Sequence, residues 1–325
     1  MKYAILVSIA AIIDLLFLPN AGKAQDALLP VTEAPNAPPA LPSFLQQDME
    51  AKCGTEDDSQ NVEAYDGGLG VSADYVQRHS PSTFLLRWKP EPAIRSALGG
   101  GDGRDVETGN IANLRWCSAT LIKERLALTA RHCFGPIGDE PAEQFFTKLR
   151  TPKVDGKWVE PPALATLHTA NFNYQFSREK QLRGEVSFPI LRLVEDGEVR
   201  GNLDYALFEI GADENGRLPA DHFGEGVVAP VSSRAAVDNE LIAIIQHPLG
   251  DPKRIDAGRV IEAGAPWMYY NDIDTLSGSS GSGIRDASGV VIGVHTNGGC
   301  DQAAFGYKNR GVLLQAIAPI SDVIE

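Results

Sequence analysis

The sequence has little cysteine and little positive charge, and both shortages narrow the classes of protein to which it can belong. Only four of its 325 residues are cysteine, and no two of them form the C-x-x-C pair that is typical of structural zinc sites. It contains 29 Lys and Arg residues against 43 Asp and Glu residues, which gives a formal net charge of −14. A strongly acidic chain is a poor partner for nucleic acid or for an anionic membrane surface. We therefore expect no nucleic-acid partner, no metal site and no cofactor.

A long apolar run occurs only at the start of the chain. Lys2 is followed by an apolar stretch from Tyr3 to Leu18, and small residues ending at Ala24 offer a cleavage site. This order predicts a secretory signal peptide over residues 1–24. The alternative is a membrane anchor, against which Asp14 inside the apolar run argues. Because no later segment has the roughly 18 consecutive apolar residues of a membrane span, we expect a secreted or periplasmic protein without stable membrane insertion.

The segment that follows the predicted signal peptide is rich in proline. Residues 25–48 contain five prolines and many alanines. Such a composition is typical of an extended connecting segment. We therefore interpret residues 25–60 as a linker or pro-segment, and residues 61–325 as the folded domain.

From residue 83 onward the chain reads as a series of short strands. Apolar or alternating runs such as TFLLRW, CSATLI, YALFEI and GVVIGVHT are separated by Gly, Pro, Asp and Asn residues. That pattern is typical of an all-β barrel or sandwich. The C-terminal stretch GVLLQAIAPISDVIE has the apolar stripe of a short helix, interrupted at Pro319. The glycine-rich loop at 99–110 does not lead into a helix with phosphate-binding spacing, so it predicts no nucleotide site.

Residues 116–134 place a histidine beside features that would hold it. One strand begins at Cys117, and the strand that returns from it leads to His132 and Cys133. A disulfide between the two cysteines would tie the strands together and fix the loop that carries the imidazole. The T-A-x-H-C sequence, with a cysteine on the preceding strand, resembles the histidine motif of the chymotrypsin/trypsin superfamily of serine peptidases. The resemblance implies that His132 is the catalytic base.

A second segment resembles the aspartate motif of the same superfamily. Asp204 begins a D-x-A-L sequence in an apolar strand. In a catalytic triad its carboxylate would accept the Nδ1 proton of His132, hold the ring in one tautomer and stabilise the imidazolium. Taken alone, Asp204 could also be a turn residue before a strand.

The third segment, DTLSGSSGSGI, resembles the nucleophile motif G-x-S-G-[GS] of that superfamily. The register of the motif selects Ser280 as the nucleophile over the neighbouring serines. It also implies that the N–H groups of Gly278 and Ser280 form the oxyanion hole. The chain order His, Asp, Ser fits this superfamily and does not fit subtilisins or α/β-hydrolases.

The resemblance covers roughly residues 80–315 and implies two antiparallel six-stranded β-barrels with the triad at their interface. We place the first barrel at about 80–205 and the second at about 206–312, followed by the short C-terminal helix. An even number of cysteines in an exported chain suggests two disulfides. Cys53 and Cys300 therefore form the candidate second pair, which would anchor the N-terminal segment to the second barrel.

The candidate substrate-binding residues resemble those of bacterial glutamyl endopeptidases. His295 lies fifteen residues after Ser280 and Thr275 lies five before it, at positions that in that branch hold the carboxylate of an acidic P1 residue. Thr296, next to the histidine, joins this substrate-binding set. Asp274 complicates the prediction, because it lies six residues before Ser280, where trypsin carries the aspartate that binds Arg or Lys. An acidic P1 preference is therefore the prediction, and a basic preference is the alternative.

Together these features predict a secreted serine endopeptidase. It would hydrolyse peptide bonds in protein or peptide substrates through an acyl-enzyme, and we expect it to act as a monomer. One rival interpretation is a protease-like binding protein that has lost catalysis. Another is an enzyme that acts on esters or cell-wall peptides, because the same triad serves all acyl transfers.

Overall fold

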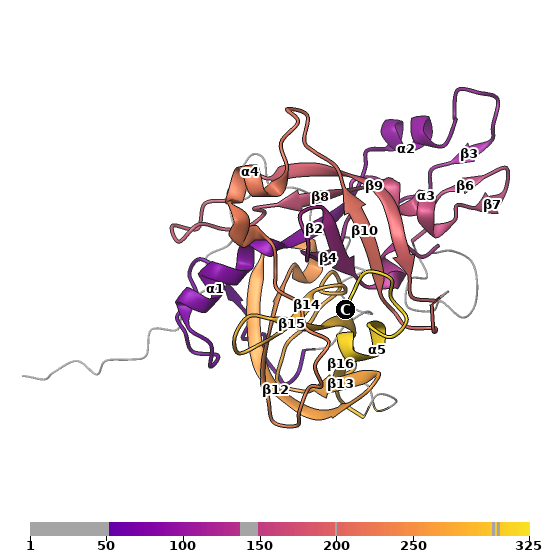
Figure 1. Cartoon of the computed structure of the whole chain (residues 1–325). Coiled ribbons are helices and arrows are strands. Elements are labelled where there is room, and N and C mark those ends of the chain that lie inside the picture. The colour runs from indigo at the N-terminus through magenta and orange to yellow at the C-terminus, as the bar shows by residue number, and fades with distance from the viewer. Residues whose placement is uncertain (1–51, 137–148, 199, 301–302, 304–305) are drawn as a thin grey trace, which may run out of the picture. The chain divides into compact units, whose positions relative to one another are not determined.

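The protein is described by a computed structural model over residues 52–136, 149–198, 200–300, 303 and 306–325 (Figure 1). The predicted signal peptide and most of the predicted linker lie outside the described residues. Strands dominate, and no described helix has the length and apolar character needed to cross a membrane. The helices are α1 (Ala73–His79), α2 (Glu91–Ala97), α3 (Pro161–Thr166), α4 (Pro219–Phe223) and α5 (Leu314–Ile317).

Six antiparallel strands close into the first barrel, in the order β10-β5-β4-β2-β8-β9. Aromatic rings fill much of its core. The rings of Phe84 and Phe172 stack with their centroids 4.3 Å apart, and those of Phe134 and Phe208 meet edge to face at 5.2 Å. The strands are β2 (Thr83–Trp88), β4 (Arg115–Leu121), β5 (Leu126–Thr129), β8 (His168–Phe172), β9 (Val186–Asp196) and β10 (Ala206–Ile210).

The second barrel also has six antiparallel strands. Its long strand β12 pairs with β11 along one part and with β13 along the other. The remaining pairings, through β16, β15 and β14 back to β11, close the ring. The strands are β11 (Leu241–Gln246), β12 (Arg254–Gly264), β13 (Trp267–Tyr270), β14 (Gly283–Asp286), β15 (Val291–Asn297) and β16 (Asn309–Leu313).

These observations confirm the predicted fold class of two six-stranded antiparallel barrels followed by a short C-terminal helix, α5. The boundary between the barrels, expected near residue 205, instead lies after β10. The reason is that β10 pairs with β5 and β9 of the first barrel. A separate small sheet is formed by β3 (Val106–Glu107), β6 (Lys153–Val154) and β7 (Lys157–Trp158).

Strand β10 packs on both of its faces, because side chains alternate along a strand. Phe208 and Ile210 belong to the core of the first barrel. Leu207 points the other way and belongs to a cluster that includes Val294 of the second barrel. The start of β10, two residues after Asp204, therefore lies where the two barrels meet.

The N-terminal segment packs on the second barrel before the chain enters the first. Its strand β1 (Gln60–Asn61) pairs with the start of β12. Apolar residues of the segment, including Tyr65 and Val76, cluster with Ile245 and Ile255 of the second barrel. The chain then passes through α1 and the 3-10 turn η1 (Ser80–Ser82) into β2. Residues 60–82 are thus an integral part of the packed structure.

Candidate active site

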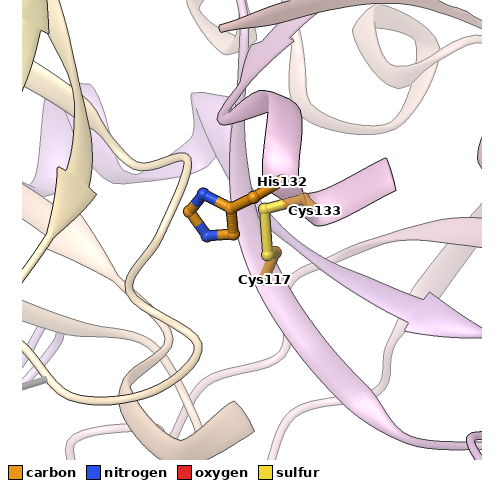
Figure 2. Close-up of side chains that lie close together, drawn as sticks. All are labelled: Cys117, His132 and Cys133. Atoms are coloured by element: carbon orange, nitrogen blue, oxygen red, sulfur yellow. A yellow bond between two sulfur atoms is a disulfide. The ribbon is translucent and has the colours of Figure 1, made fainter. Parts of the chain in front are cut away.

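His132 lies on a short 3-10 turn, η2 (Arg131–Phe134), that directly follows β5. A disulfide joins Cys117 of β4 to Cys133 of this turn, with the two Cα atoms 6.1 Å apart. Figure 2 shows the imidazole of His132 projecting away from the two sulfur atoms. Because both sulfurs are consumed in the disulfide, they cannot serve as thiolate ligands for a metal ion. The bridge instead fixes the turn that presents the imidazole, as the spacing of the two cysteines predicts.

Asp204 holds both the ring and the backbone of His132. Its Oδ2 accepts a hydrogen bond from Nδ1 of the imidazole at 2.8 Å, and its Oδ1 accepts one from the backbone N–H of His132 at 3.0 Å. Burial on its own would raise the pKa of Asp204. The nearby His132 and the hydrogen bonds from it outweigh burial, so the pKa of Asp204 lies below its ordinary value. An ionised Asp204 keeps the imidazole proton on Nδ1 and leaves Nε2 to act as a base.

Ser280 lies in the loop before β14 and is held through its backbone. Its carbonyl accepts a hydrogen bond from the N–H of Ser118 on β4 at 2.9 Å. The same carbonyl lies 3.8 Å from Sγ of Cys133, a residue 147 positions earlier in the chain. Gly281 has φ +87°, and a Cβ at that position would overlap with Ser118 and with Thr129. The fold therefore brings Ser280 beside the disulfide next to His132, and the glycine allows this close approach.

Gly278 adopts a left-handed backbone conformation that favours glycine, and its surroundings leave no room for a side chain. It has φ +98°, and a Cβ there would lie 2.6 Å from the carbonyl oxygen of His247 and 2.8 Å from the amide nitrogen of Gly250. Within the described part of the chain, the N–H of Gly278 donates no hydrogen bond. A buried N–H without an acceptor among the described residues can stabilise a developing oxyanion.

Two interactions that support the loop of Gly278 involve residues outside the recognised motifs, and the sequence did not predict them. The hydroxyl of Ser118 donates to the carbonyl of Gly278 at 2.8 Å and accepts the N–H of His247 at 2.9 Å. The N–H of Leu249 donates to the carbonyl of Ser277. Leu249 has φ +57°, which is unusual for a residue with a branched side chain and stores backbone strain. The turn at residues 247–250 thus packs directly against the loop of Gly278.

Three of the predicted substrate-binding residues are buried, and one of them, His295, contacts the loop of Gly278 and Ser280 (the serine loop) directly. His295 of β15 accepts the N–H of Gly281 at 2.8 Å through its carbonyl, and its Nδ1 bonds to the hydroxyl of Tyr270. Thr275 is fully buried, and its hydroxyl has no hydrogen-bond partner among the residues that the structure describes. Thr296 is also buried, but its hydroxyl already donates to Oδ1 of Asn297 at 3.0 Å.

The fourth predicted substrate-binding residue, Asp274, is engaged elsewhere. Its Oδ1 accepts the N–H of Cys53 at 2.6 Å and its Oδ2 accepts the N–H of Asp58 at 3.0 Å. The second expected disulfide, Cys53–Cys300, is also present, with its Cα atoms 5.0 Å apart. The sequence suggests the disulfide through cysteine parity, but it gives no sign that Asp274 binds the segment that the disulfide anchors.

Comparison with known proteins supports a peptidase. A family profile described as the trypsin-like peptidase domain matches residues 117–294. No curated protein matches the chain. One similar solved structure is a Glu endopeptidase in complex with MPD, at 16% identity and a TM-score of 0.47, covering 81% of this chain and 93% of that one. Another is a protease from M. tuberculosis in its active form, at 12% identity and a TM-score of 0.47, covering 83% and 92%.

The family match spans more than half of the chain and includes the disulfide, His132, Asp204 and Ser280. The two closed barrels are the architecture expected of that family. The protein therefore belongs to the family of proteases built on a trypsin-like peptidase domain.

Proposed function

We propose that the protein is a serine endopeptidase with His132, Asp204 and Ser280 as its catalytic triad. The observation that carries this proposal is the pair of hydrogen bonds by which Asp204 holds both the imidazole and the backbone of His132. A carboxylate that only capped a turn would not need to orient the ring. The position of Ser280 beside Cys133 supplies the third partner from the other barrel.

The proposed reaction begins when Oγ of Ser280 attacks the carbonyl carbon of the scissile peptide bond. A bond forms between Oγ and that carbon while the hydroxyl proton passes to Nε2 of His132. The negative charge on the former carbonyl oxygen is stabilised by the N–H groups of Gly278 and Ser280. His132 then gives the proton to the leaving amine, and the carbon–nitrogen bond breaks to leave an acyl-enzyme. A water molecule, deprotonated by His132, releases the acid and restores Ser280.

We propose further that the enzyme prefers an acidic residue at P1. The buried hydroxyl of Thr275, which lacks a partner in the described chain, can donate to a substrate carboxylate. His295 is joined to the serine loop through its backbone, and Tyr270 orients its ring. A hydroxyl and an imidazole are suitable ligands for a carboxylate, and both come from segments next to Ser280.

Export to an oxidising compartment, either outside the cell or in the periplasm, is part of the proposal. Two disulfides are formed by the four cysteines of the chain. Disulfides persist in oxidising compartments and are rare in the cytosol. The predicted signal peptide provides the route.

The proposal is tested by digesting a denatured proteome with the full chain exported from a bacterial host, and reading the cleavage sites by mass spectrometry. We expect cuts after Glu and Asp that are absent with Ser280→Ala. Ser288→Ala is the matched control, because Ser288 is an exposed serine on the hairpin between β14 and β15, and it should cleave like the wild type. Cuts after Arg and Lys would overturn the acidic preference. Equal cleavage by wild type and Ser280→Ala would overturn the triad.

A further inference from the structure

Both carboxylate oxygens of Asp274 are occupied by backbone N–H groups from a distant part of the chain. The donors are Cys53 and Asp58, which lie 221 and 216 residues earlier in the sequence. The side chain is buried, with only 3% of the residue exposed. Two backbone N–H groups therefore already occupy the acceptor atoms that a cationic side chain would use. A basic P1 side chain would have to displace these donors before it could bind Asp274.

The segment that supplies these donors is anchored at its start by a covalent bond. Cys53 is joined to Cys300 across a sequence separation of 247 residues. Asn309 of β16 lies at the same place, where its Nδ2 donates to the carbonyl of Ile273 at 2.9 Å and its Oδ1 accepts the N–H of Gly299 at 2.8 Å. Ile273, which precedes Asp274, and Gly299, which precedes Cys300, are therefore linked through the buried side chain of Asn309.

The end of the same segment is held by the second barrel as well. Gln60 and Asn61 pair with Ile255 and Arg254 at the start of β12. Nε of Arg254 also donates to Oγ of Ser59 at 2.7 Å. Asp274 thus binds this segment at two points, Cys53 and Asp58. The segment is also fixed by the disulfide at Cys53 and by the strand pairing that begins at Gln60.

We propose that Asp274 is a positioning residue that clamps residues 53–58 to the second barrel and so fixes the neighbouring Thr275, rather than a ligand for a basic P1 side chain. The statement about Thr275 rests on the proposed function, since that residue matters only if it binds substrate. The clamp itself does not rest on the proposed function. It explains how this chain carries an aspartate six residues before Ser280 without requiring trypsin-like specificity.

The clamp also has a consequence for maturation. If a pro-segment is removed, the cut must lie before Cys53 for the donors of Asp274 to stay in one chain. A cut between Cys53 and Asp58 would leave a peptide attached only through the disulfide. The mature enzyme should therefore begin at or before residue 53, and its intact mass should be unchanged by reduction apart from the added hydrogens.

The clamp is tested with Asp274→Asn, which keeps the size of the side chain but has only one acceptor oxygen. Asp272→Asn is the matched control, since Asp272 is an exposed aspartate two residues earlier whose carboxylate accepts the N–H of Arg259. Hydrogen exchange of peptides that cover residues 53–58 is compared between the two variants, both in a Ser280→Ala background that prevents autolysis. Loss of one backbone hydrogen bond should speed exchange in Asp274→Asn by about 10-fold. Equal exchange in the two variants would overturn the clamp.

The second readout is catalysis, with Ser280 intact. We expect Asp274→Asn to raise KM by about 10-fold with little change in kcat, because the pocket loosens while the triad stays in place. The class of P1 residue should stay the same. Loss of Arg and Lys cleavage on mutation would show that Asp274 faces substrate and would overturn the proposal. If the wild type proves inactive, the proposed function fails, but the exchange experiment still decides whether the clamp exists.

Discussion

The two barrels hold their parts of the proposed site by different means. In the first barrel, His132 lies beside a disulfide whose cysteines are only 16 residues apart. Asp204 forms a hydrogen bond with the imidazole of His132. In the second barrel, the serine loop and Asp274 are held by partners far away in sequence, namely Ser118 and the N-terminal segment at Cys53. The base is therefore held by contacts within the first barrel, whereas the nucleophile loop is held by contacts from other parts of the chain.

The second barrel also buries ionisable groups. Burial lowers the pKa of Lys253 to about 7 and raises that of Asp256 to about 8. Lys253 donates to the carbonyl of Ser80 at 2.8 Å, and the buried Arg285 donates to Oγ of Ser82 at 2.6 Å, so both contact the turn that leads into the first barrel. Burying a charge is costly unless it is paired and hydrogen-bonded. The packing of the second barrel should therefore respond to pH more strongly than the packing around His132.

The largest effect is expected in the first barrel, from Asp204→Asn. The amide cannot hold the Nδ1–H tautomer of His132, so kcat should fall by roughly 1,000- to 10,000-fold. Steady-state kinetics on a peptide substrate measure the change. Asp213→Asn is the control, because Asp213 bonds to Nε2 of His222 at 2.9 Å in a second Asp–His pair outside the proposed site. Comparable losses in the two variants would contradict the proposed role of Asp204.

An intermediate effect is expected from Ser118→Ala, which removes the hydroxyl that joins the first barrel to the loop of Gly278. The loop should then sample positions in which its N–H no longer faces the oxyanion, lowering kcat by roughly 10- to 100-fold, less than the loss of a direct donor. The affinity for a peptide aldehyde, which forms a tetrahedral adduct, should fall in parallel.

Ser187→Ala is the control for this change, because Ser187 is a serine of the first barrel that bonds to Asn171 rather than to the serine loop. A rise in KM without a change in kcat would mean that Ser118 supports the pocket and not the oxyanion loop.

The smallest effect concerns pH and Asp256, which accepts the N–H of Asp274 at 2.6 Å. Burial raises the pKa of Asp256 first of all, and the nearby Asp58 and Asp274 raise it further. Because its folded pKa is about 8 and its ordinary value is 3.8, its contribution to stability is present below about pH 4 and is lost as pH rises through 8. Asp256→Asn should therefore gain stability relative to the wild type as pH rises.

The measurement is the melting temperature from pH 5 to pH 9, with both proteins in a Ser280→Ala background. The difference between variant and wild type should grow in favour of the variant across this range. A difference that is independent of pH would show that Asp256 does not titrate in this window.

The parts of the proposed site that sequence motifs predict are local in the chain. His132 and Cys133 are adjacent, and Gly278 and Ser280 lie within three residues, so their spacing is readable in the chain. The alternation of apolar residues also predicts the short strands of both barrels, because that pattern follows from side-chain geometry. The predicted boundary between the barrels, near residue 205, is wrong by the length of β10, which belongs to the first barrel.

The contacts of the second barrel could not be predicted in the same way. Ser118 reads as a small residue in an apolar strand, and only the folded chain places its hydroxyl against Gly278. Asp274 stands at the position of a specificity residue, yet the donors that occupy it are Cys53 and Asp58. Hydrogen bonds between segments 160 or more residues apart leave no local pattern, so position in a motif can mislead about what a side chain binds.

The most direct test of the proposed catalytic site is active-site labelling with a fluorophosphonate, followed by peptide mapping. Only a serine activated by a neighbouring base should react quickly. The proposal predicts one modified residue, Ser280, with no labelling in Ser280→Ala and slow labelling in Asp204→Asn. Labelling of another serine in the loop, or equal rates in wild type and Asp204→Asn, would contradict the assignment of the triad.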